Sequence, residues 1–184
     1  MGPLLLLLAL ACSPAEVPDQ TVSLDTLQMD RDGGIYRQGE EAFSGYATRY
    51  DPGGFLRERV AFLDGRRHGD REQWYADGTL SAVTHYQHNR RDGISRTYWK
   101  DGALRSESQF EDGVAHGTQR QWYKDGAIFK EIQLELGREQ GLQRAWRPNG
   151  ELYNNYEAKN GRTFGLRRSK LCFELSEEEV ISAK

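Results

Sequence analysis

Apolar and polar positions along this chain repeat with a period of 24 residues from Gly45 onward. In the unit that starts at Asp70, one run ends in Trp74 and Tyr75, residues 76–78 form a turn signal, and a second run covers residues 79–87. Short runs that alternate apolar and polar side chains are typical of β-strands. The pattern therefore predicts two strands per unit, joined by tight turns.

Glycine holds three positions of the unit almost without exception. The three series are Gly45, Gly69, Gly93, Gly117, Gly141 and Gly165; Gly54, Gly78, Gly102, Gly126 and Gly150; and Gly65, Asn89, Gly113, Gly137 and Gly161. Asn89 is the exception, and asparagine is the other residue type that tolerates a positive φ. The series predict an array of one small unit, which is usually a binding surface rather than a catalytic cleft.

Turn chemistry predicts the register of each hairpin. Pro52 and Pro148 favour a three-residue loop that a following Gly closes as a bulge, and this loop pairs Trp74 with Leu80. Three almost wholly apolar columns then share one face, and we expect them to form the buried stripe. They are Tyr50, Trp74, Tyr98, Trp122 and Trp146; Leu56, Leu80, Leu104, Ile128 and Leu152; and Phe62, Tyr86, Phe110, Leu134 and Ala158.

The opposite face is predicted to be polar, with Tyr75, Trp99 and Tyr123 as aromatic exceptions in adjacent units. One interpretation is an exposed platform that stacks on sugars or receives a partner's side chains. The alternative is cross-strand packing that stiffens a single-layer sheet.

A column of arginines lies two residues before the column aromatics. It consists of Arg96, Arg120, Arg144 and Arg168. Arginine stems that cover the aromatic stripe, with cation–π contacts, are one interpretation. A strip that binds anionic head groups or an acidic partner is the other.

The fold class that follows is all-β, an elongated antiparallel meander of about ten to twelve strands. The chain has 184 residues, of which 37% are hydrophobic, so a thick two-layer core is not expected. A net charge of −3 with both signs mixed provides no electrostatic basis for nucleic-acid binding. Because each unit contacts only its neighbours, the two end units need caps.

The first residues read as a targeting segment. The apolar run from Leu4 to Ala11 is too short to span a bilayer but suits a signal peptide over residues 1–11. The run ends at Cys12, and this junction resembles the lipobox of bacterial lipoproteins, where the cysteine carries lipid. We expect a lipid anchor on Cys12, an outer-membrane location and a tether over residues 12–30. Ordinary cleavage and a soluble secreted protein are the alternative.

Residues 166–184 are expected to form a closing strand, around Leu171, Phe173 and Leu175, and an acidic tail. Cys172 lies in that strand. It reads as a small apolar residue, as a reactive thiol, or as the partner of an unlipidated Cys12 in a disulfide.

The unit G-x-x-x-x-W/Y-Y-x-D-G-x-L resembles the MORN-repeat variant family, often described as YwqK-type antitoxin proteins. The resemblance covers residues 31–165, as five full units and a lead-in at residues 32–36. The turn at residues 51–54, Asn89 and Arg147 depart from the pattern. The family implies an all-β repeat sheet used for protein contact or membrane-proximal scaffolding.

No nucleophile–base pair with a supporting spacing is present, so no catalytic residue, metal or cofactor is predicted. His68 and His116 share one repeat position, but they lie in alternate units of the sheet, which is too far for joint metal ligation. The leading functional hypothesis is a non-enzymatic, lipid-anchored scaffold that binds an envelope protein. The alternatives are a glycan- or peptidoglycan-binding module and an antitoxin-like inhibitor of a toxin or hydrolase.

Overall fold

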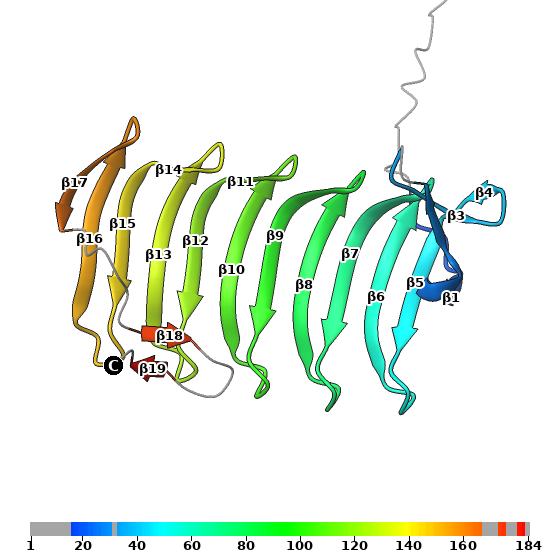
Figure 1. The fold of residues 1–184 in the computed structure, drawn as a ribbon, viewed down its shortest axis with the longest axis horizontal. Coiled ribbons are helices and arrows are strands. Elements are labelled where there is room, and N and C mark those ends of the chain that lie inside the picture. Colours follow the sequence, from blue (N-terminus) through cyan, green and yellow to red (C-terminus); the bar gives the residue numbers. More distant parts are fainter. Residues whose placement is uncertain (1–15, 31–32, 167–172, 176–179, 183–184) are drawn as a thin grey trace, which may run out of the picture.

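The computed structural model describes residues 16–30, 33–166, 173–175 and 180–182. Figure 1 shows one long row of strands, and the described residues place 14 of them in a single sheet. The strands of the repeats are β5 (Gly45–Tyr50), β6 (Leu56–Leu63), β7 (Arg66–Trp74), β8 (Leu80–Gln87), β9 (Arg90–Tyr98), β10 (Leu104–Glu111), β11 (Val114–Ala115), β12 (Gly117–Trp122), β13 (Ile128–Glu135), β14 (Arg138–Glu139), β15 (Gly141–Trp146), β16 (Leu152–Lys159) and β17 (Arg162–Leu166). The predicted all-β meander of hairpin repeats is confirmed.

Each Asp-Gly hairpin is closed in the same way. The amide of Tyr75 donates to the carbonyl of Thr79 at 2.8 Å, and the Asp77 carboxylate accepts the Thr79 amide at 2.9 Å. Gly78 supplies the positive φ, 85°, that the loop requires. Trp74 pairs with Leu80, so the predicted hairpin register is confirmed.

Beyond that pair, each hairpin has a β-bulge that the alternation argument missed. Gln73 pairs with Ala82 while Trp74 pairs with Leu80, so Ser81 is left without a partner on β7. One extra residue moves every later side chain to the other face of the sheet. The predicted single stripe is therefore wrong, because Trp74 and Leu80 lie on one face and Tyr86 lies on the other.

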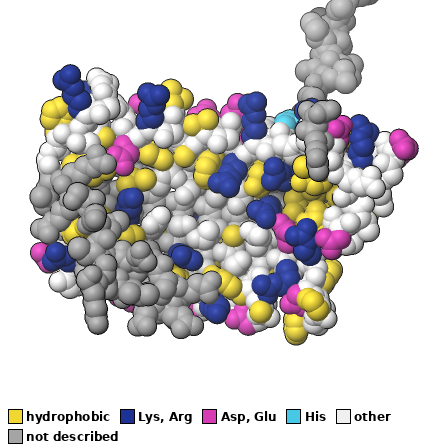
Figure 2. Space-filling view, viewed as in Figure 1, with side chains coloured by type: hydrophobic (Ala, Val, Ile, Leu, Met, Phe, Trp, Pro, Cys, Tyr) yellow, Lys and Arg dark blue, Asp and Glu magenta, His cyan; other side chains and the backbone are white. Residues whose placement is uncertain are grey.

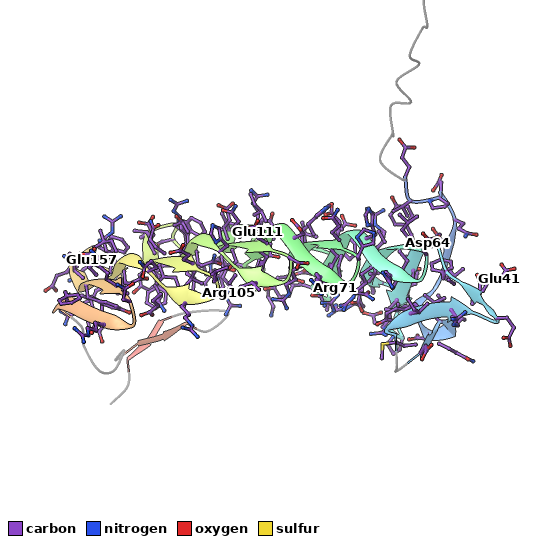
Figure 3. The ribbon with its side chains drawn as sticks, turned by 90° about the horizontal axis from the view of Figure 1, so that it is seen from above. Glu41, Asp64, Arg71, Arg105, Glu111 and Glu157 are labelled. Carbon is purple, nitrogen blue, oxygen red and sulfur yellow. The ribbon has the colours of Figure 1, made fainter. Side chains whose placement is uncertain are left out.

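We call the two sides of the sheet face A and face B. Face A carries the pairs Ala47–Val60 and Arg71–Thr84 and the aromatic rings of Phe62 and Tyr86. Face B carries, among others, the pairs Arg59–Glu72 and Trp74–Leu80. In Figure 3, Arg71 and Arg105 lie on the side that also carries the β2–β4 and β18–β19 strands, and Glu111 and Glu157 lie on the other.

The predicted positive φ at the third glycine series is confirmed, and Asn89 adopts it with φ 71°. Its side chain also accepts the Arg67 amide at 2.9 Å and donates to the carbonyl of Gly34 at 2.9 Å. At Gly65 a side chain would not fit, because a Cβ would lie 2.7 Å from the carbonyl oxygen of Tyr36. These turns lock the repeats to one another and to the N-terminal segment.

Residues 21–30 belong to the fold, so the tether prediction is wrong for them. Strand β1 (Thr21–Ser23) pairs parallel with β5, and a 3-10 turn η1 (Leu24–Thr26) leads to a small sheet of β2 (Gln28–Asp30), β3 (Ile35–Gln38) and β4 (Glu41–Ala42). This segment covers a buried cluster of Phe43, Ala47, Val60 and Phe62, against which Val22, Leu24, Leu27 and Tyr36 pack. It is the cap that the first unit needs.

At the other end β17 is the last strand of the long sheet in the described part of the chain. Strand β18 (Phe173–Leu175) pairs with β19 (Val180–Ser182) in a separate two-stranded sheet, so the prediction that it closes the long sheet is wrong. Residues 1–15, which include Cys12, and Arg168, Leu171, Cys172 and residues 177–179 lie outside the described residues. The described residues contain no helix long and apolar enough to cross a membrane.

Candidate binding surfaces

Face A buries two of the three aromatic residues that the sequence placed on an exposed platform. Trp99 is 1% exposed and Tyr123 is 2% exposed, and Tyr75 is half-buried. The hydroxyl of Tyr75 donates to the carbonyl of Tyr98 at 2.8 Å, and the hydroxyl of Tyr123 donates to that of Trp146 at 2.7 Å. Burial, with Asp125 nearby, raises the pKa of Tyr123 to about 12. The exposed platform is wrong, and these residues tie successive units together.

The unpaired bulge residue explains this burial, because it projects onto face A beside the residue that begins its own turn, which is aromatic in three of the five units. The two are six residues apart. The contacts are Asp51–Arg57 at 4.0 Å, Trp99–Arg105 at 4.6 Å, Tyr123–Phe129 at 5.1 Å and Arg147–Tyr153 at 5.6 Å. The contact is an ion pair in the first unit, a cation–π pair in the third and fifth units, and a ring pair in the fourth. This complementarity at a spacing of six was visible in the sequence and could have revealed the bulge.

The remaining pair is Tyr75 and Ser81, and its small serine side chain does not fill the space beside the tyrosine ring. Serine there leaves a cavity of about 440 Å³ on face A, lined by Arg49, Arg57, Glu58, Gln73, Trp74, Tyr75 and Ser81. Glu58 is 7% exposed, and it accepts hydrogen bonds from Arg71 at 2.7 Å and Arg49 at 3.2 Å. The cavity wall is therefore charged, and Arg49 and Glu58 are paired within it.

Face B carries the apolar residues that the sequence assigned to the core. They form five cross-strand pairs, Tyr50–Leu56, Trp74–Leu80, Tyr98–Leu104, Trp122–Ile128 and Trp146–Leu152. Tyr50 is 58% exposed, Leu152 is 41% exposed, and the others are half-buried. We call this row the apolar band.

Beside the apolar band runs a ladder of paired charges. Arg59 contacts Glu72 at 2.6 Å, Arg96 contacts Glu107 at 2.9 Å, and Glu131 receives Arg120 at 2.9 Å and Arg144 at 2.5 Å. Burial would raise the pKa of Glu131, but the hydrogen bonds from Arg120 and Arg144 hold it below its usual value. We call this row the ion ladder.

The ion ladder decides between the two interpretations of the arginine column only in part. Arg144 does lie over the Trp146 ring, at 5.3 Å, as the covering interpretation predicted. Arg96 and Arg120 instead have carboxylate partners on the neighbouring strand. Glu107 and Glu131 pair with Arg96, Arg120 and Arg144, which reduces the positive charge that the ion ladder presents to an anion.

The histidines do not form a metal centre. His85 bonds to Asp70 at 2.8 Å, and the rings of His68 and His88 are 5.2 Å apart. Burial, then His88 and His85, lowers the pKa of His68. No group of three potential metal ligands occurs among the described residues.

Two consecutive hairpins match the family model for the MORN repeat variant, over residues 67–88 and 91–112. These two segments are similar to MORN repeats. They correspond to the hairpins β7–β8 and β9–β10, and the flanking hairpins of the same sheet keep their turn bonds and bulges. MORN repeats are scaffold modules rather than members of an enzyme family. No curated protein matches the chain.

Proposed function

We propose that this MORN repeat protein is a non-enzymatic scaffold that binds another protein of the bacterial cell envelope through the apolar band. The observation that carries the proposal is the five aromatic–aliphatic pairs on face B, of which Tyr50 and Leu152 are the most exposed. Tryptophan and tyrosine dominate the binding energy of protein interfaces. A rigid sheet also presents them without a large entropic cost on binding.

The ion ladder supports a protein rather than a charged small molecule as the occupant of face B. Each of its arginines is paired with a glutamate, so it provides a polar rim with little net charge. An apolar centre with a polar rim is the usual anatomy of a protein interface.

A capture experiment tests the role of the apolar band. The chain is immobilised and exposed to solubilised envelope, beside a Trp74→Gln, Trp122→Gln variant. Phe164→Gln is the matched control, because Phe164 is 56% exposed and lies on face B away from the band. Loss of one retained protein with the double variant only is the expected result. Equal retention by all three forms would contradict the proposal, as would a homodimer in light scattering that the double variant dissociates.

We also propose that Cys12 carries a lipid that anchors the scaffold at the outer membrane. The support is the apolar run that ends at this cysteine. Metabolic labelling with a fatty-acid analogue should label the natural chain and not a Cys12→Ser variant. Equal labelling, or a soluble natural chain on fractionation, would contradict the anchor and leave the test of the apolar band unaffected.

A further inference from the structure

The middle of face A, over β7–β10, has a floor of small hydroxyl side chains. Two cross-strand rows make it, Arg71–Thr84–Ser95–Ser108 and Gln73–Ala82–Thr97–Ser106. The hydroxyls of Thr97 and Ser106 bond to each other at 2.6 Å. We call this part of face A the hydroxyl floor.

Three arginines stand at the ends of the hydroxyl floor, and each guanidinium group lies on an aromatic ring. Arg67 lies 4.6 Å from the Tyr86 ring, Arg91 lies 5.2 Å from the Phe110 ring, and Arg105 lies 4.6 Å from the Trp99 ring. Among the described residues none of the three has a carboxylate partner. They differ in this from Arg71 and the arginines of the ion ladder.

Uncompensated guanidinium groups held flat on rings are prepared to bind anions. Stacking fixes the side chain and leaves the N–H edge free to donate two parallel bonds to a carboxylate. Figure 2 shows the same face, with Lys and Arg side chains around a central area of mostly uncharged polar atoms. Nε of Arg67 is buried and has no hydrogen-bond partner among the described residues.

We infer that the hydroxyl floor binds an extended acidic peptide segment, with carboxylates on Arg91 at one end and Arg105 at the other. The inference goes beyond the proposed function, because it uses the opposite face of the sheet. Arg91 and Thr97, which is paired with Ser106 beside Arg105, are six residues apart on one extended strand. At ~3.3 Å per residue the two cations are roughly 20 Å apart, which an extended peptide of about six residues spans.

The shape of face A favours a narrow chain over a flat surface. The β2–β4 strands and the β18–β19 hairpin stand on this side of the sheet near its two ends, as Figures 1 and 3 both show. A bilayer would meet these hairpins before the floor, whereas a single peptide fits between them. Hydroxyl groups both donate and accept, so the floor can bond a peptide backbone regardless of its sequence.

Fluorescence anisotropy with the full chain tests this inference. The probe is a labelled peptide with glutamates at both ends of a six-residue Ser-Gly segment, and its glutamine analogue is the first control. We expect binding of the glutamate peptide that weakens with salt, and at least tenfold weaker binding of the glutamine peptide. Equal affinity for both peptides, or no binding at low salt, would overturn the inference.

Charge-matched variants separate a site from a general effect of net charge. Arg67→Gln, Arg91→Gln and Arg105→Gln together should weaken peptide binding about tenfold or more, whereas Arg96→Gln, Arg120→Gln and Arg144→Gln together should change it less than about twofold. Ser95→Glu should also abolish binding without removing any stacked arginine, and Ser95→Gln should not. Equal losses in both triple variants would overturn the inference.

Competition identifies the class of anion. Inorganic phosphate, a polyanionic polysaccharide and vesicles of anionic lipid should each displace the peptide only weakly. Displacement by one of them at lower concentration than by the unlabelled peptide would overturn the peptide assignment. The apolar-band variant Trp74→Gln, Trp122→Gln should bind the peptide normally, so failure here and failure of the scaffold proposal are distinguishable.

Discussion

Face A and face B of this sheet carry the same kinds of residues, aromatics and arginines at a period of 24, but use them in opposite ways. On face A, Trp99 and Tyr123 are almost fully buried, and Arg67, Arg91 and Arg105 have no carboxylate partner among the described residues. On face B the aromatics are half-exposed and the arginines are paired with glutamates. A repeat period therefore identifies which residues are equivalent without saying which are buried.

The difference arises at the hairpin turn. The bulge residue adds a side chain to face A, and this side chain covers the turn aromatic of the same unit, as Phe129 covers Tyr123. Face B gains no such residue, so Trp74 and Leu80 pack only on each other and on their neighbours. Two faces with similar composition thus become a core and a candidate interface.

Truncation of Trp99 is expected to have the largest effect on stability and to separate the two faces most clearly. Trp99→Ala should lower the free energy of unfolding by about 3–5 kcal/mol, because it empties a fully buried site. Trp74→Ala on face B should cost less, about 1–2 kcal/mol, since the ring is half-exposed. Urea unfolding followed by circular dichroism measures both, and equal costs would show that the faces are not energetically distinct.

Glu131→Gln sharpens the role of the ion ladder. The carboxylate is 12% exposed and receives two arginines, so we expect a loss of about 1–2 kcal/mol, limited because both guanidinium groups remain solvated. Glu107→Gln, which removes a more exposed carboxylate that has one arginine partner, is the matched control with a smaller loss.

This contribution also depends on pH. The folded-state pKa of Glu131 is lowered, so its stabilisation is present above the unfolded pKa near 4.3 and is lost as pH falls through the folded value. The difference in urea midpoint between the natural chain and Glu131→Gln should therefore shrink between pH 7 and pH 3. A constant difference would contradict the charged pairing.

Ser81→Phe should make the second hairpin resemble the fourth. The new ring would fill the cavity beside Tyr75, as Phe129 fills the space beside Tyr123, and stabilise the fold by about 0.5–1 kcal/mol. Ser81→Ala keeps the cavity and should be close to neutral. Thermal unfolding distinguishes them, and a lower midpoint for the phenylalanine variant would mean that the cavity is not a simple vacancy in the repeat.

The smallest expected effect concerns His68, near the edge where adjacent hairpins meet. Burial, His88 and His85 lower its pKa, so the stability linked to its neutral form is present above about pH 6.5 and is lost as pH falls through the lowered value. His68→Gln should remove this small pH dependence. His116→Gln, at the same repeat position, is the control, and an unchanged pH profile in His68→Gln would contradict the assignment.

Much of the fold followed from the sequence, because turns depend on local chemistry. The pairing of Trp74 with Leu80 and the positive φ of Asn89 were both predicted from neighbouring residues alone. The candidate surfaces were less predictable. The apolar band was recognised as a set of columns but assigned to the core, and the pairing of Arg120 with Glu131 was not anticipated.

The N-terminal cap is a second feature that was not predicted from the sequence, and it depends on contacts between segments far apart along the chain. Residues 21–30 have no periodic pattern, yet Val22 and Leu24 pack on Phe62 and β1 pairs with β5. A parallel pair between distant segments leaves no local signature, since each strand needs only a free edge and an apolar contact.

The sequence by itself determined the repeat, its period, the turns and the partners across each hairpin. Backbone conformation at glycine, asparagine and proline depends on the residue and its immediate neighbours. The tertiary structure alone decided which face is buried and which charges are compensated. Those properties depend on which face of the sheet each side chain takes after a bulge, and on contacts between strands of neighbouring units.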